Sequence, residues 1–244
     1  MIVRRAAFAL LAAALPIGVS PASALPIAGT GLTLSGTATL VSDYRYRGIS
    51  QSMGDPALQA GIAIRDGSGL YAGVWTSYVK FHDRRQGGGS NGMDTEFDLY
   101  GGWNGRIAQH SVLDVGLIYY VFPGMSGDTD MAEATASLTQ SVGSAEVKFG
   151  AAYDWDQKAS PDDMLYLYGE GTLPIARTPF VLRAHAGRTL YGPDYRFACD
   201  YWDWSLGTEA HFGRFTAGLS YVDTDLRRVR HAGAGLIASI GVSF

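Results

Sequence analysis

Hydrophobic and polar side chains alternate along most of the chain from residue 32 onwards. Between Leu32 and Arg47, the even positions are mostly apolar and end in two tyrosines, whereas the odd positions carry hydroxyls and then charges. Neighbouring side chains of a β-strand point to opposite faces, so this period of two predicts a strand with one apolar and one polar face. The segment is longer than a typical strand of a soluble sheet, as expected for a tilted strand that crosses a membrane.

The same alternation recurs in later segments that are separated by glycine-rich or polar turns. The further predicted strands cover residues 58–65, 70–78, 96–103, 113–120, 132–139, 146–154, 165–173, 180–187, 201–212, 215–221 and 236–244. In the segment 113–120, Leu113, Val115, Leu117 and Tyr119 alternate with Asp114, Gly116, Ile118 and Tyr120, and because both faces are largely apolar the sequence leaves the phase of this strand open. Together the segments predict about twelve strands, joined alternately by short and by longer, more polar connections, as in a bacterial barrel with both chain ends on one side.

The chain begins with the features of a secretory signal peptide. Arg4 and Arg5 form a basic start, an uncharged apolar run follows, and Ala22-Ser23-Ala24 fits a peptidase cleavage site. We therefore expect residues 1–24 to be removed and residues 25–244 to form one barrel domain. An uncleaved membrane anchor is the alternative, but the apolar run is short for a spanning helix.

Aromatic side chains near the strand ends favour a membrane barrel over a soluble β-sandwich. Those on the apolar faces are Tyr44, Tyr46, Tyr78, Trp103, Tyr153, Trp202, Trp204 and Phe212. Rings of this kind form girdles at both edges of an apolar band. Because every backbone N–H and C=O inside a bilayer needs a partner, the sheet must also close on itself. The predicted fold class is therefore all-β, a single antiparallel transmembrane β-barrel in the cell outer membrane.

The last predicted strand ends in an aromatic residue, Phe244. A terminal aromatic after an amphipathic strand resembles the signal that the outer-membrane barrel-assembly machinery recognises. We therefore expect this machinery as a partner, together with outer-membrane lipid and lipopolysaccharide.

Composition and charge agree with this class. Apolar residues make up 47% of the chain, and 32 glycines and 14 tyrosines suit a protein of tight turns and strands. The formal charge of −4 does not favour nucleic acid as a partner. The single cysteine, Cys199, excludes a disulfide scaffold.

Several segments resemble the TorF-type porin family, also known as the Gcw_chp conserved-hypothetical family. The first is Ser-Asp-Tyr-Arg-Tyr-Arg-Gly-Ile-Ser-Gln-Ser at residues 42–52, and the others are residues 56–59, 70–75, 96–102 and 119–124. The resemblance covers most of the chain beyond the signal segment and is strongest before residue 125. It implies an outer-membrane barrel with a channel role, and it supplies no substrate or catalytic residue.

Charged side chains on the polar faces are predicted to line the lumen. They are Asp43, Arg45, Arg47, Arg65, Glu96, Asp98, Asp114, Glu133, Lys148, Glu170, Arg183, Asp203 and Glu209. Acids outnumber bases, so an open lumen would weakly favour cations. Alternatively, the charges pair across strands and fill the interior, because about twelve strands lie between a filled eight-stranded barrel and an open sixteen-stranded one.

Three charges of the first loop region have two interpretations. Asp43, Arg45 and Arg47 could form a constriction opposite acids such as Glu96 or Asp98, or they could hold the following Gly-Ile-Ser-Gln segment in a structural corner. The inward rings of the barrel are likewise open to two roles, stacking on a solute or filling space beside glycines. These rings are Tyr71, Trp75, Tyr120, Tyr166 and Tyr168.

The predicted function is a porin for the passive diffusion of small hydrophilic solutes, with a cation preference and no cofactor. A non-conducting structural or adhesive barrel is the alternative. A lipid-modifying enzyme is a weaker one, for which His185, Asp203, Ser205 and His211 would supply the chemistry. No zinc-binding spacing or phosphate loop accompanies them.

Overall fold

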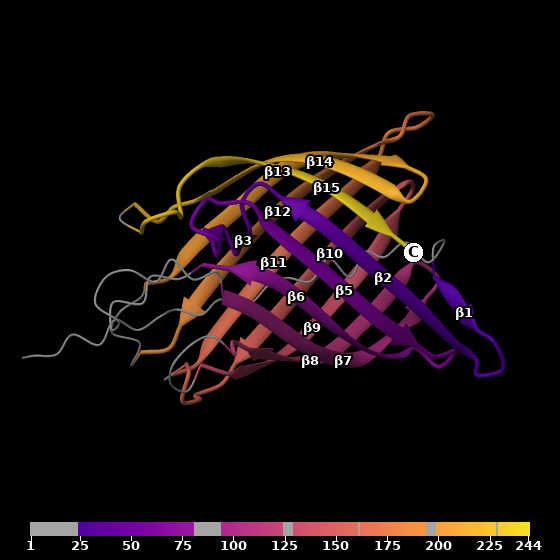
Figure 1. Cartoon of the computed structure of the whole chain (residues 1–244), viewed down its shortest axis with the longest axis horizontal. Helices are drawn as coiled ribbons and strands as arrows, with labels where there is room; N and C mark the ends of the chain where they lie inside the picture. Colours follow the sequence, from indigo (N-terminus) through magenta and orange to yellow (C-terminus); the bar gives the residue numbers. More distant parts are fainter. Residues whose placement is uncertain (1–23, 81–93, 124–128, 161, 194–198, 228) are drawn as a thin grey trace, which may run out of the picture.

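The computed structural model describes residues 24–80, 94–123, 129–160, 162–193, 199–227 and 229–244. The expected signal segment, residues 1–24, lies outside the described residues except for Ala24. In the described part of the chain, twelve long antiparallel strands close into one barrel, as predicted (Figure 1).

Each barrel strand pairs with its neighbours in the sequence, and the first pairs with the last. The barrel strands are β2 (Leu32–Val41), β5 (Ala57–Arg65), β6 (Leu70–Val79), β7 (Asp94–Ala108), β8 (Ser111–Val121), β9 (Met131–Val142), β10 (Ala145–Asp154), β11 (Met164–Pro174), β12 (Phe180–Tyr191), β13 (Tyr201–Phe212), β14 (Phe215–Thr224) and β15 (Gly235–Ser243). Three short strands complete the set: β1 (Leu25–Ile27), β3 (Arg45–Tyr46) and β4 (Ile49–Ser50).

The seam of the barrel lies between β15 and β2. Ser239 pairs with Val41, and beyond the strand end the backbones of Phe244 and Gly36 exchange two hydrogen bonds of 2.9 and 3.0 Å. The sequence pattern did not predict β1, which pairs with β2 just beyond this seam (Figure 1). One strand of the closed sheet, β2, thus contacts both ends of the described chain.

The outer face of the barrel is apolar. Leu206, Phe149 and Leu236 are each more than three-fifths exposed, and five of the predicted girdle aromatics are exposed as well. Those five are Tyr78, Tyr153, Trp202, Trp204 and Phe212. The structure sets the phase of the segment 113–120, which its sequence left open: Leu117 is 57% exposed whereas Ile118 is buried. An apolar outer face is what a bilayer requires.

In the described part of the chain, no helix has the length and hydrophobicity needed to span a membrane.

The connections alternate in length, which gives the barrel two distinct ends. At one end, here the short-turn end, strands are joined by tight turns such as residues 66–69 and 143–144. At the other, the long-loop end, the connections are longer, as between residues 42 and 56. This alternation was predicted from the spacing of the polar segments.

The first strand is shorter than predicted, and this is a correction. It ends at Val41, and residues 42–56, here called the inward loop, fold into the long-loop end of the barrel. Tyr44 and Tyr46, which we placed on the lipid-facing girdle, are only 4% and 2% exposed. The alternation was misleading because the chain leaves the sheet while its sequence keeps a period of two.

A tight hairpin makes this departure possible. Strands β3 and β4 pair through Arg45–Ser50 and Tyr46–Ile49, and the turn between them contains Arg47 and Gly48 with positive φ values of 44° and 80°. A side chain at Gly48 would also collide with Thr224. Glycine is therefore required at position 48 both by backbone conformation and by space.

Candidate functional site

The inward loop packs against strands on several sides of the barrel. Tyr44 contacts Trp75 of β6 in an edge-to-face arrangement with ring centroids 5.5 Å apart. The backbone N–H of Ser50 donates to the carbonyl of His231 at 3.0 Å, on the approach to β15. Arg47 at the loop tip reaches Glu133 of β9 and Tyr166 of β11, each five strands around the barrel from β2, so the loop lies across the lumen at its long-loop end.

Asp43 and Arg45 hold the inward loop in shape. Arg45 Nε lies 2.5 Å from the Asp43 carboxylate, and its guanidinium also donates to the carbonyls of Gly48 and Gly233. The hydroxyls of Ser50 and Ser52 donate to the other carboxylate oxygen of Asp43. For these two charges, the structural-corner interpretation is confirmed.

Arg47 fastens the tip of the inward loop to the barrel wall. Its guanidinium lies 2.5 Å from the Glu133 carboxylate of β9, and the two side chains are 2% and 3% exposed. The guanidinium also lies over the rings of Tyr46 and Tyr166, 4.7 and 4.2 Å from their centroids, and 3.8 Å from the sulfur of Met164. Burial lowers the pKa of Arg47, but the Glu133 carboxylate and the surrounding tyrosines together raise it more, so the side chain stays charged.

Arg47 does not meet either of the acids named for a constriction. We placed Arg47 opposite Glu96 or Asp98, whereas it pairs with Glu133. The sequence could not distinguish these carboxylates, because all three are inward-facing and near the long-loop end of their strands.

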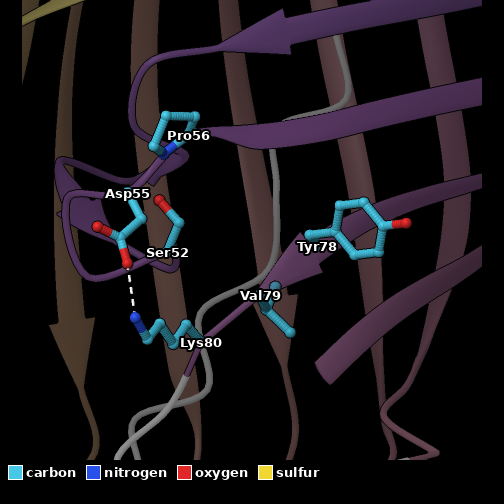
Figure 2. Close-up of a pocket in the computed structure, with 6 residues that line it drawn as sticks. All are labelled: Ser52, Asp55, Pro56, Tyr78, Val79 and Lys80. Atoms are coloured by element: carbon cyan, nitrogen blue, oxygen red, sulfur yellow. Dashed lines mark hydrogen bonds and ion pairs between the residues drawn. The ribbon is translucent and has the colours of Figure 1, made fainter. Parts of the chain in front are cut away.

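A second ion pair lies at the base of the inward loop. Figure 2 shows Lys80 directed at Asp55, with Nζ 2.6 Å from the carboxylate, while Tyr78 points away from the pair. The backbone N–H of Lys80 also donates to the carbonyl of Gln51 at 2.8 Å. These residues border a pocket of about 80 Å³, which is too small for a typical solute site.

A chain of polar contacts follows the lumen wall below Arg47. His185 Nε2 lies 2.9 Å from Asp203 and 2.8 Å from the hydroxyl of Tyr166, which itself donates to Asp203 at 3.1 Å. His185 Nδ1 lies 3.7 Å from Glu170, and Glu170 pairs with Lys148 at 2.9 Å. The predicted cross-strand pairing is thus present on β10 to β13.

The short-turn end of the lumen is lined by paired charges that remain accessible. Arg183 lies 2.8 Å from Glu209, with side chains 46% and 29% exposed. Arg65 donates to the side chain and backbone of Asn104, and Asp114 accepts a bond from Tyr71 at 2.9 Å.

Charge is therefore distributed unevenly along the lumen. Buried carboxylates gather near the long-loop end and are Glu96, Asp98, Glu133, Asp154 and Asp203, each at most 2% exposed. In the described part of that end, Arg45, Arg47 and Lys80 are the basic side chains that pair with acids at the inward loop. Accessible charges near the short-turn end are instead paired with charges of opposite sign, as in Lys148–Glu170 and Arg183–Glu209.

The predicted inward rings fill space beside small residues. Tyr166 stacks on Tyr168 with centroids 5.6 Å apart, and His185 lies parallel to both. A side chain at Gly150 or Gly187 would collide with one of these tyrosines. The glycines of the neighbouring strands thus make room for the rings.

The histidine arrangement does not match a serine nucleophile. Ser205 is the cross-strand neighbour of His185, but both ring nitrogens of His185 face carboxylates, Asp203 and Glu170. A serine triad needs one of these nitrogens free for the hydroxyl. Among the described residues, no three or more His, Cys, Asp and Glu side chains are grouped as metal ligands.

Sequence reasoning missed the role of Tyr46 in the site. Its ring lies under Arg47, although the alternation assigned it to lipid. The signal that could have found it is Gly48, which together with the polar segment Ser50–Ser52 interrupts a strand pattern and indicates a turn.

Comparison with solved structures identifies other outer-membrane barrels of similar fold. The NanC porin matches with a TM-score of 0.58 and 14% identity, covering 86% of this chain and 98% of its own. An outer membrane channel from Pseudomonas putida F1 gives 0.56 and 11%, covering 92% and 98%. The KdgM porin, solved in complex with disordered oligogalacturonate, gives 0.56 and 6%, covering 86% and 97%. At these identities the likeness establishes the fold.

Sequence comparison gives one further result. The family described as "Bacterial protein of unknown function (Gcw_chp)" matches residues 27–241. No curated protein is significantly similar in sequence.

Proposed function

Because the chain belongs to the Gcw_chp family of bacterial proteins of unknown function, we propose its role from the barrel itself: an outer-membrane channel for passive diffusion of small hydrophilic solutes. Within the family, the segments at residues 42–52 and 96–102 favour the TorF-type porins. The chain catalyses no reaction in this proposal and needs no cofactor.

One observation carries the proposal: the barrel is apolar outside and has accessible ion pairs inside. Leu206 is 64% exposed on the outer face, whereas Lys148 and Glu170 are each 31% exposed on the inner face. An accessible polar lumen within a lipid-facing sheet is the arrangement that porins use.

The proposed cation preference rests on the predicted lumen residues. Eight are carboxylates and five are basic. Because the most acidic part lies beneath the inward loop, the preference is weak with the loop in place and should grow when the loop is removed.

Export and assembly complete the proposal. Residues 1–24 act as a signal peptide that is cleaved, and the strand that ends in Phe244 engages the barrel-assembly machinery. The outer face then contacts membrane lipid and lipopolysaccharide.

A non-conducting structural or adhesive barrel is the second candidate. The inward loop favours it, because Tyr44, Tyr46 and Arg47 are buried across the long-loop end. A lipid-modifying enzyme is less well supported, since His185 is engaged by two carboxylates.

Single-channel recording in a planar bilayer tests the proposal. The refolded protein, residues 25–244, should give discrete current steps, and its reversal potential in a salt gradient should be biased towards cations. A folded barrel that gives no current, with and without the inward loop, would overturn the channel and leave the structural or adhesive role.

A further inference from the structure

Glu96 and Asp98 form a buried acidic pair in the wall of the barrel. They are two residues apart on β7, so both point to the same, inner face. Both residues are buried: Glu96 is 1% exposed and Asp98 is 0% exposed. Ser77 of β6 is the cross-strand neighbour of Glu96, and Trp75 is that of Asp98.

Among the described residues, no basic side chain forms an ion pair with either carboxylate. Glu96 Oε1 and both oxygens of Asp98 accept no hydrogen bond from the described residues. The buried guanidinium of Arg47 does not balance these carboxylates, because it pairs with Glu133. Leaving two ionised carboxylates buried and unpaired is very unfavourable, so a cation or a proton must compensate them.

The inward loop adds a third oxygen at this point. Tyr44 is 4% exposed, and its hydroxyl lies beside the Glu96 carboxylate but makes no hydrogen bond of standard geometry to a described residue. Burial and then the adjacent Glu96 and Asp98 carboxylates raise the pKa of this hydroxyl well above its usual value. The ring is held in place by Trp75, so the hydroxyl is fixed beside the carboxylates.

We propose that Glu96, Asp98 and the Tyr44 hydroxyl bind a divalent cation, Mg²⁺ or Ca²⁺, between the inward loop and β7. All three ligands are oxygens, which hard cations prefer. One divalent ion neutralises both carboxylates, and Mg²⁺ in particular is often held by only one or two carboxylates together with water. The ion joins the loop to the wall at β7, two strands from the Arg47–Glu133 pair on β9.

This site does not depend on the proposed channel. It predicts that divalent cations stabilise the barrel with its loop inside, whether or not the barrel conducts. Conductance without cation stabilisation would reject the site alone, and stabilisation without conductance would reject the channel alone.

Thermal unfolding tests the site directly. The refolded protein is treated with chelator in detergent, and Mg²⁺ or Ca²⁺ is then titrated at constant ionic strength. The midpoint should rise with cation concentration, because a ligand that binds only the folded state stabilises it progressively. Glu96→Gln and Asp98→Asn should abolish the rise, while Tyr44→Phe should weaken apparent affinity roughly tenfold.

A matched control removes an acid elsewhere. Glu146 is exposed at the short-turn end, so Glu146→Gln should keep the full cation-dependent rise. Luminescence of Tb³⁺ locates the ion independently of folding stability. Excitation of tryptophan should sensitise bound Tb³⁺ through Trp75, Mg²⁺ should displace the signal, and Trp75→Phe should reduce it.

Two outcomes would overturn the site. One is a wild-type midpoint that ignores divalent cations while Glu96→Gln or Asp98→Asn raises it, which would mean that a proton compensates the pair. The other is a cation-dependent rise that survives in the double variant, which would place the ion elsewhere.

Discussion

Arg47 holds the inward loop against the barrel wall. Its guanidinium is buried and pairs with Glu133, and two tyrosine rings sandwich it. Buried pairs of this kind are stabilising only as long as both partners are present. Arg47 therefore specifies where the loop sits more than it adds to overall stability.

Arg47→Met should lower the free energy of unfolding by roughly 3–5 kcal/mol, because Glu133 is left as a buried, unpaired charge. The double variant Arg47→Met/Glu133→Gln should recover much of this loss. Urea unfolding of the refolded barrel measures both. Losses that simply add in the double variant would contradict the coupling.

Asp66 makes pH-dependent hydrogen bonds in a turn at the short-turn end of the barrel. Its carboxylate accepts bonds from the hydroxyl and N–H of Ser68 and from the N–H of Leu70, at 2.7–3.0 Å. The Ser68 hydroxyl, followed by these backbone groups, lowers the pKa of Asp66 below its usual 3.8. A depressed folded-state pKa means that the stabilisation is present above the unfolded value and is lost as the pH falls through the folded one.

Asp66→Asn should therefore flatten part of the acid limb of the stability profile. The difference from wild type should be present at neutral pH and vanish as the pH falls through and below 3.8. Unfolding midpoints measured across this range provide the test. Parallel profiles for the two proteins would show that Asp66 makes no pH-dependent contribution to the stability of the barrel.

At the scale of elements, the inward loop is the part that sequence reasoning placed wrongly. The barrel strands were predictable because each must present an apolar face to lipid and a polar face to the lumen. The loop obeys no such rule, since its apolar residues Tyr44 and Tyr46 pack inside the lumen. Its position follows from long-range pairing with Glu133, 86 residues away, which local alternation cannot encode.

The lumen residues show the same division. The inward direction of residues such as Glu170 and Arg183 followed from strand phase alone. Which acids would be paired and which would stay unpaired did not, because it depends on barrel register and on the loop. Sequence thus predicts the lining of a barrel better than its contents.

Replacing residues 43–55 with a short glycine-serine linker, together with Glu133→Gln, should raise single-channel conductance. The loop crosses the long-loop end, so its removal widens the path, and Glu133→Gln avoids an unpaired charge. A control that exchanges the exposed turn residues Gly213-Arg214 for Asn-Gly should keep the wild-type current. Unchanged conductance in the loop variant would mean that the loop does not limit passage.

At the scale of the molecule, the segregation of charge makes selectivity depend on the loop. With the loop present, accessible charges are paired; without it, Glu96, Asp98 and Asp203 face the open lumen. The loop-replaced barrel should therefore show a more cation-biased reversal potential than wild type in the same salt gradient. An equal or anion-shifted potential would contradict this electrostatic arrangement.

The apolar outer face allows a test of which side of each strand contacts lipid. Leu206 lies midway along β13 and is 64% exposed, so Leu206→Arg should destabilise the lipid-inserted barrel by roughly 2–4 kcal/mol. The lumen-facing control Ser220→Arg should cost much less. Equal losses for the two variants in lipid would contradict the assigned faces.

The seam has a consequence for how the chain could be rewired. Phe244 pairs with Gly36, and Leu25 pairs with Leu34, so the two ends lie head to tail along one edge of β2. A single added residue opposite Ser35 would join β15 to β1 as one continuous strand. A circular permutant joined there and opened at the exposed turn Gly143-Ser144 should still fold to a heat-resistant barrel, visible as the same gel shift on boiling. Chain order would then be separable from barrel closure.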